Sequence, residues 1–280
     1  MRNTRTCMSG NFNTGVSKCP VNLDNIKAAI LVRKGVKLPK SLTAEKLEEL
    51  AHADGNERIY GILPFVEYAK NGGEVQTSAI GYGAEQETGV SAQKDTFTLD
   101  RYYPELDAAL SANENKAYDV YYVDDANTLI GINDGTEELA GIPMACVYSD
   151  ATQFNTSGAK ATMTVTFCHT NSKILKRKFD YAALDFDVQG LILGLTAVEL
   201  VKAEGNEYKI VEKVGGYDLT ALYGSLIKDG GSAVLVGTTS SVSYNEDKET
   251  LTITSSDESE PKLAKPSVLF TKGIKGIEQL

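Results

Sequence analysis

The sequence predicts a mainly β fold, sandwich- or barrel-like, with one or two short helices and an additional small C-terminal β module. The 280 residues include 25 glycines and only 7 prolines, and Val, Ile, Thr and Tyr recur in short runs. Such runs are typical of strands joined by turns. The clearest lies at residues 160–169, where Ala161, Met163, Val165 and Phe167 alternate with threonine, which is the period of a half-buried strand.

The length of the chain suits either one large β domain or two smaller ones. We expect an extended N-terminal arm at residues 1–25, because Gly, Asn, Ser and Thr dominate there. We expect the main β domain at 26–190 and a small C-terminal β domain at 191–280, where short strands become evenly spaced. No repeat of solenoid length is visible.

The first predicted elements of the main domain are a strand at residues 26–32 and a short helix at about 43–53. Ser41 or Thr43 can cap this helix, because a side-chain oxygen there accepts a free backbone N–H of the first turn. A second short helix is predicted over 104–112, since its first residue is a proline and proline is favoured in the first helical turn.

The other segments of the main domain are predicted strands and turns. Residues 59–68 contain Pro64, which removes a ladder hydrogen bond and so predicts an edge or bent strand. Residues 83–94 are polar and acidic without periodicity, which predicts a mobile loop between two strands. Residues 118–123 and 128–132 predict a hairpin around an acidic turn. Further strands are predicted at 75–82, 95–99, 142–148, 160–169 and 174–179.

The C-terminal domain is predicted to hold short strands around one helix of one to two turns, over residues 218–227. The even spacing of its strands favours a small sandwich or a sandwich extension. These strands are predicted at 195–201, 208–214, 234–236, 241–244 and 250–254.

The net charge of −10 is unevenly distributed along the chain. Residues 1–42 carry a net charge of +7, whereas residues 81–150 carry −11. This polarity does not fit a simple nucleic-acid binder. An acidic surface repels phosphates, as a wall past which DNA slides would need to do. The candidate acidic surface comprises Asp124, Asp125, Asp134, Glu137 and Glu138.

Few residues suit acid–base or nucleophilic catalysis. His52 and His169 are the only histidines. Cys168 and His169 point to opposite faces of one predicted strand, so they cannot act as a pair. The Gly-x-Ser-x-Gly and phosphate-loop motifs are absent, and the acidic residues lack the spacing of an EF-hand. We therefore expect no catalytic, cofactor-binding or metal site, and we interpret the histidines as packed or surface side chains.

The four cysteines lack the spacing of a zinc or redox pair. Cys7 and Cys19 could approach each other across a hairpin, although free thiols in a reducing compartment are the favoured interpretation. No apolar run reaches about 18 residues, and the N-terminus shows no signal-peptide core. We therefore expect synthesis in the cytoplasm and no membrane partner.

The stretch from Val120 to Gly135, a strand, an acidic turn and a return strand followed by Gly135, resembles segments of bacteriophage tail tube (major tail) proteins. The arm, the β domain, the long polar loop and the added C-terminal module resemble the organisation of that family. The resemblance implies subunits that form rings, commonly hexameric, stacked into a hollow tube with an acidic lumen for DNA. Gly83–Lys94 would be the inter-ring loop and residues 1–42 the arm.

The resemblance also implies the partners and the location of the protein. The partners would be further copies of this chain and other virion proteins, with DNA only as passing cargo. The protein would be part of the virion after synthesis in the cytoplasm of the host. The candidate assembly interface comprises Arg33, Lys34, Lys37, Lys40, Gly83, Glu85, Glu87 and Lys94.

Three alternatives remain open at this point. The first is a head–tail connector or capsid-associated protein, which is again structural. The second is a carbohydrate-binding or adhesin module, which would need an exposed tyrosine platform. The third, ranked last, is a hydrolase that uses the acidic cluster.

Overall fold

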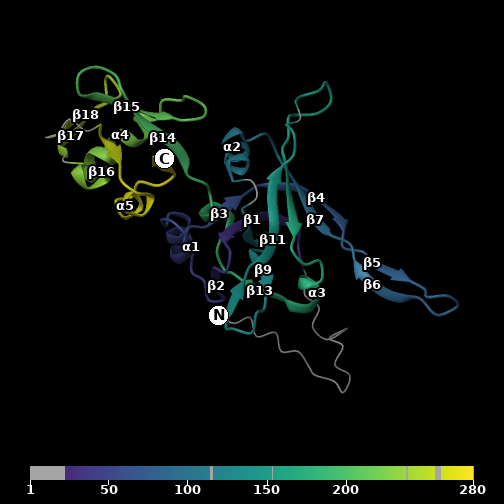
Figure 1. The fold of residues 1–280 in the computed structure, drawn as a ribbon. Coiled ribbons are helices and arrows are strands. Elements are labelled where there is room, and N and C mark those ends of the chain that lie inside the picture. Colours follow the sequence, from purple (N-terminus) through teal and green to yellow (C-terminus); the bar gives the residue numbers. More distant parts are fainter. Residues whose placement is uncertain (1–22, 114–115, 153, 238, 256–259, 280) are drawn as a thin grey trace. The chain divides into compact units, whose positions relative to one another are not determined.

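A computed structural model describes residues 23–113, 116–152, 154–237, 239–255 and 260–279 (Figure 1). The predicted mainly β class is confirmed, with 43% strand and 19% helix. Nearly all of the predicted arm at residues 1–25, including Cys7 and Cys19, lies outside the described residues. The chain divides into two compact units, of which unit 1 comprises residues up to 47 and 59–192, and unit 2 comprises 48–58 and 193–280.

Unit 1 is built on one antiparallel sheet of eleven strands, which follow the order β2-β10-β9-β8-β11-β12-β7-β4. The other three strands lie off this path, because β1 pairs with β8, β3 pairs with β1, and β13 pairs with β9. The strands are β1 (Ile26–Arg33), β2 (Lys37–Pro39), β3 (Tyr60–Ile62), β4 (Phe65–Gly72), β7 (Gln93–Leu99), β8 (Tyr118–Asp124), β9 (Thr128–Ile132), β10 (Glu138–Ala140), β11 (Ile142–Ser149), β12 (Thr164–His169) and β13 (Phe179–Ala183).

The main core of unit 1 is assembled by the period-two alternation of its strands. Phe97 of β7 and Phe167 of β12 point into it and meet at right angles, with ring centroids 5.7 Å apart. Phe65 of β4 stacks on Phe97 at 4.4 Å. The opposite faces of β7 and β12 carry threonines, so this part of the sheet has one apolar and one polar face.

A second hairpin extends the pair β4–β7 away from the sheet (Figure 1). Its strands are β5 (Val75–Ser78) and β6 (Gln86–Val90), which pair antiparallel. We call residues 73–92 the hairpin arm. The mobile loop predicted at 83–94 is therefore wrong in part, since most of it forms β6 and the start of β7. The Thr88 hydroxyl donates to the Gln76 carbonyl at 3.1 Å, which supports this pairing.

The two helices predicted for the first half of the chain are present. Helix α1 (Ala44–Ala51) begins after Thr43, whose Oγ1 accepts the Lys46 backbone N–H at 3.2 Å. Helix α2 (Pro104–Ala112) has its proline in the first turn and buries Leu110.

The strand predicted at 174–179 is wrong, because Ile174–Lys178 form the short helix α3 before β13 begins. Asn171 sets up this turn, since its Oδ1 accepts the Lys173 N–H and its carbonyl accepts the Ile174 N–H. The basic residues Lys176 and Lys178 then lie in the last turn of the helix, where the helix dipole favours positive charge. A 3-10 turn at Gln189–Leu191 follows β13.

Unit 2 contains a five-stranded sheet with the order β17-β18-β15-β14-β20, in which only β14 and β20 run parallel. Buried Val198, Ile210 and Ile253 of this sheet and Ile227 of α4 form its core. Its elements are β14 (Thr196–Lys202), β15 (Glu207–Glu212), α4 (Thr220–Gly230), a 3-10 turn (Gly231–Val234), β16 (Leu235–Val236), β17 (Thr239–Asn245), β18 (Thr250–Ser255), β19 (Lys262–Leu263), α5 (Pro266–Thr271) and β20 (Ile277–Gln279).

Residues 48–58 join unit 2 although they lie far from it in sequence. Arg58 makes a two-pronged ion pair with Glu278, with N–O distances of 2.5 and 2.9 Å. His52 stacks on Phe270 at 4.6 Å between ring centroids. The two units therefore differ from the continuous domains 26–190 and 191–280 expected from the sequence, by this one inserted segment.

We expect Phe167→Ala to lower the free energy of unfolding of unit 1 by about 3–5 kcal/mol, because it leaves a cavity among stacked aromatic rings. Guanidinium denaturation followed by circular dichroism measures this loss. Phe154→Ala is the matched control, since Phe154 is 83% exposed, and it is expected to change little. Equal losses in the two variants would contradict this account of the core.

Candidate assembly surface

Strand β4 forms one end of the large sheet. Among the described strands, β7 alone pairs with it. The single strand predicted at 59–68 is wrong in part, because Pro64 divides this segment into β3 and β4, although the expected edge strand is present as β4. An edge strand presents a row of backbone groups that another strand can pair with.

The core is incompletely covered along β4. Tyr68 packs against the buried Phe97, with ring centroids 5.0 Å apart, yet half of Tyr68 remains exposed. Val66 on the same strand is 56% exposed. Apolar groups that extend a core into solvent are typical of surfaces that a partner covers.

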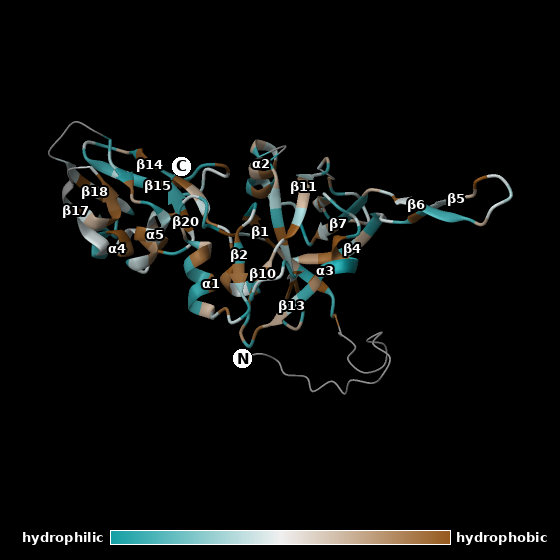
Figure 2. Ribbon diagram, turned by 60° about the horizontal axis from the view of Figure 1, so that its bottom comes forward, coloured by the Kyte–Doolittle hydropathy of each residue, from teal (hydrophilic) through white to brown (hydrophobic). Residues whose placement is uncertain are grey.

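The hairpin arm adds further apolar groups to this edge. Ile80 is 84% exposed, Tyr82 is fully exposed and Val75 is about half exposed. The Gly83 N–H donates to the Ile80 carbonyl at 3.1 Å, which closes the turn that presents Ile80 and Tyr82. Figure 2 shows the hydrophobic stretch near the tip, beyond the hydrophilic strands of the arm. These apolar side chains were not among the interface residues predicted from the sequence, most of which are charged.

The predicted interface residues within the hairpin arm lie on the surface of the protein. Gly83, Glu85 and Glu87 are exposed. Glu85 accepts a hydrogen bond from the Thr77 hydroxyl at 3.0 Å across the arm. Glu87 pairs with Lys173, whose hydrogen bond and charge lower the pKa of Glu87. This pair links β6 to the turn before α3.

Two of the four predicted basic residues at 33–40 pair with acidic residues of the same chain. Lys37 pairs with Asp134, and this hydrogen bond, together with Thr136, holds the pKa of Asp134 well below its usual range. Lys40 Nζ lies 2.5 Å from Asp180. Strand β2 causes the first pairing, because it runs beside β10 and so brings residues 37–39 next to 138–140.

Arg33 and Lys34 lie at the other end of this basic segment. Arg33 is the last residue of β1 and is half-buried, whereas Lys34 is exposed in the following turn. The Gly35 N–H of the same turn donates to Asp119 at 2.7 Å. Of the four basic residues, Lys34 is thus the most open to a partner.

Asp124 does not belong to the acidic surface, contrary to the prediction. It is fully buried, and its Oδ1 accepts the backbone N–H groups of Ala126 and Thr128 at 3.0 and 2.7 Å. It therefore stabilises the turn between β8 and β9, in which Asn127 has a positive φ of 58°. Among the other candidates, Asp125, Asp134, Glu137 and Glu138 are exposed.

A buried carboxylate lies behind the exposed edge. Asp95 of β7 accepts hydrogen bonds from the Tyr68 hydroxyl at 3.0 Å, the Tyr122 hydroxyl at 3.2 Å and the Gln93 amide at 3.2 Å. His169 Nε2 is also in hydrogen-bond contact with it. Asp95 and His169 are both buried, which agrees with the prediction of a packed histidine.

Asp95 remains charged despite its burial. Burial alone would raise the pKa of Asp95, but the hydrogen bond and charge of His169, then the bonds from Gln93 and Tyr68, outweigh it and lower the pKa. The same network raises the pKa of Tyr68, through burial first and then through Asp95. The burial of Asp95 could have been predicted from the sequence, because residues 95, 97 and 99 lie on the same face of one strand and Phe97 and Leu99 are apolar.

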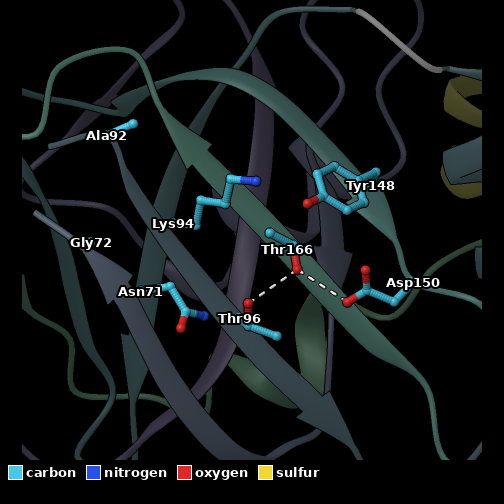
Figure 3. Close-up of a pocket in the computed structure, with 8 residues that line it drawn as sticks. All are labelled: Asn71, Gly72, Ala92, Lys94, Thr96, Tyr148, Asp150 and Thr166. Carbon is cyan, nitrogen blue, oxygen red and sulfur yellow. Dashed lines mark hydrogen bonds between the residues drawn. The ribbon is translucent and has the colours of Figure 1, made fainter.

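The opposite, polar face of β7, β12 and β11 forms a shallow, open cavity of about 470 Å³. Figure 3 shows Lys94 and Tyr148 pointing toward each other above a row in which Thr166 contacts Thr96 at 3.1 Å and Asp150 at 3.3 Å. The charge of Tyr148, then that of Cys168, and a hydrogen bond to Tyr148 raise the pKa of Lys94. Lys94 thus faces this cavity at the base of the arm.

The described residues contain no cluster of three metal-ligating side chains. None of their helices has both the length and the apolar character needed to cross a membrane. No protein-family model matches the sequence, and no curated protein is significantly similar to it.

We expect Asp95→Asn to lower the free energy of unfolding by about 1–3 kcal/mol at pH 7, because buried donors lose a charged acceptor. The lowered pKa favours the carboxylate in the folded state. The stability that Asp95 contributes is thus fully present above its unfolded pKa of about 3.9 and is lost as the pH falls through the folded value. The difference between wild type and variant is therefore expected to shrink below about pH 4.

Urea denaturation at a series of pH values measures this difference. Tyr68→Phe is the matched control, since it removes one of the hydrogen bonds to Asp95 and leaves the carboxylate. It is expected to lower the stability less, by about 1 kcal/mol. A loss in Asp95→Asn that grows on acidification would contradict the sign of the pKa shift.

Proposed function

We propose that this chain is a structural virion protein that assembles into stacked rings and forms a bacteriophage tail tube. The open edge of β4 and the apolar hairpin arm beside it carry the proposal. A subunit of this kind has to leave an edge and an apolar patch for its neighbour. Tyr68 and Val66 supply that patch on β4, next to backbone groups that a strand of another copy can pair with.

A ring requires two different faces on each subunit, because the joints between its subunits are heterologous. Strand β4 ends the sheet path on one side, and β2 ends it on the other. Pairing of β4 with an edge of the next copy continues the sheet from subunit to subunit. The partners are thus further copies of this chain, together with other virion proteins.

The hairpin arm suits contact with the next ring. Ile80 and Tyr82 are held by a hydrogen-bonded hairpin rather than by a loose loop, so little conformational freedom is lost when they bind. A charged contact between Glu87 and Lys173 connects β6 of the hairpin arm to the turn before α3. Burying the apolar tip against a neighbouring subunit removes it from water.

The acidic residues suit the passage of DNA. Asp125, Glu137 and Glu138 are exposed, and the net charge of the chain is −10. A wall of this sign repels the phosphate backbone and does not hold it. DNA is thus a passing cargo, and the protein resides in the virion after synthesis in the cytoplasm of the host.

We expect the purified full-length chain to form rings or tubes in negative-stain electron microscopy. Tyr82→Asp is expected to abolish stacking into tubes, because it places a charge in an apolar contact. Leu222→Asp is the matched control, since Leu222 of α4 is 68% exposed and lies in unit 2. It is expected to leave tubes intact.

Light scattering detects whether the chain assembles at all, and the electron micrographs distinguish single rings from tubes. A monodisperse monomer at high protein concentration would overturn the proposal. Single rings that never stack would favour a head–tail connector or capsid-associated protein instead. Tubes are expected to weaken at high salt and after deletion of residues 1–25, since part of the attraction is between opposite charges.

A further inference from the structure

Two cysteines lie directly opposite each other on the polar face of unit 1. Cys146 of β11 and Cys168 of β12 are register partners in an antiparallel pair. Lys94 of β7 is the register partner of Cys168 on the other side. The three residues thus form one row across three strands, at the base of the hairpin arm.

The geometry of this row suits a disulfide. Directly opposed residues of an antiparallel pair have Cα atoms about 4.5–5.5 Å apart, which falls within the range of about 4.4–6.8 Å for disulfides. Both thiols are free and half-buried, so a small oxidant can reach them. Val147 and Phe167 point to the core from the same two strands, so closing the bridge displaces no core side chain.

The surroundings of Cys168 determine its protonation state. Burial, followed by a hydrogen bond with Cys146, raises the pKa of Cys168 to about 11, while Lys94 acts in the opposite direction. Cys168 is therefore a thiol at neutral pH, directly across the strand pair from Cys146. Because a thiolate is the reactive form, Cys168 is expected to react with an oxidant slowly at neutral pH.

We propose that Cys146 and Cys168 form a dithiol that closes into an intrachain disulfide when the protein meets a small disulfide such as oxidised glutathione. One protein thiolate attacks a glutathione sulfur, which forms a mixed disulfide and releases one glutathione thiolate. The second protein thiolate attacks the protein sulfur of that mixed disulfide and releases the second glutathione. The protein loses two electrons, glutathione disulfide gains them, and both thiol protons end on glutathione.

The closed bridge would connect β11 to β12, and thereby the outer strands β12, β7 and β4 to the rest of the sheet. A crosslink of this kind restricts the unfolded chain and raises the melting temperature of the protein. The modification does not depend on ring assembly, since all residues of the row belong to one chain.

The test uses a Cys7→Ser/Cys19→Ser background, in which only Cys146 and Cys168 remain of the four cysteines. The folded protein is incubated with oxidised glutathione, and its free thiols are counted over time. Trypsin then cuts after Lys116, Lys160 and Lys173, so each cysteine lies on its own peptide. Mass spectrometry without reduction is expected to find peptides 117–160 and 161–173 joined, with free thiols falling from two to none.

Two controls make the result decisive. Adding Cys146→Ser to the background is expected to leave one thiol, which forms a mixed disulfide with glutathione and gives no joined peptides. The oxidised two-cysteine protein is expected to melt several degrees higher than its reduced form, and reductant is expected to reverse the shift. Peptides that carry only glutathione, or dimers joined between chains, would overturn the proposal.

Discussion

The burial of β8 on both faces and along both edges is the constraint on which unit 1 depends. This strand pairs with β1 along one edge and with β9 and β11 in succession along the other. Val120 and Tyr122 belong to the main core, and Tyr121 and Val123 are buried on the opposite face. Because every residue of β8 after Tyr118 is buried, the strands around it have to cover it from every side.

Tyr121 shows how closely the neighbours of β8 have to fit. Its buried hydroxyl donates to the carbonyl groups of Val36 and Leu139, at 3.1 and 2.9 Å, which secures the segments around β2 and β10. A glycine at 131 is required beside it. A Cβ atom there would lie 3.2 Å from the Tyr121 ring and 2.5 Å from the Ala140 carbonyl oxygen.

The elements that sequence reasoning found are those with strong local signals. The hairpin of residues 118–132 was predictable because alternating apolar residues flank an acidic turn, and α1 and α2 because a cap or a proline begins them. The strand predicted at 75–82 contains β5, whereas β6 was missed, since Gln86, Glu87 and Thr88 are polar on both faces. A solvent-exposed strand needs no apolar alternation, so β6 leaves no periodic signal.

The candidate sites depend on contacts that the sequence does not encode locally. The alternation along β7 predicts that Asp95 and Phe97 lie on the same face. The contact between Asp95 and His169 was not predictable, because the two residues are 74 positions apart in the sequence. The polar side of Cys168 was predictable from its threonine neighbours, whereas its partner Cys146 follows only from the register of β11 and β12. Asp124 was predicted to be on the surface because it is acidic, whereas its carboxylate is buried and accepts hydrogen bonds from the turn that follows it.

The insertion of residues 48–58 into unit 2 also determines the order in which the chain can fold. Arg58 leaves the ribosome long before its partner Glu278, which lies 220 residues later. At a synthesis rate of about 5–20 residues per second, that delay is about 10–45 s. The strands of unit 1 can pair during this interval, while His52 and Arg58 remain without their C-terminal partners Phe270 and Glu278. Unit 2 can therefore be completed only after Glu278 has left the ribosome.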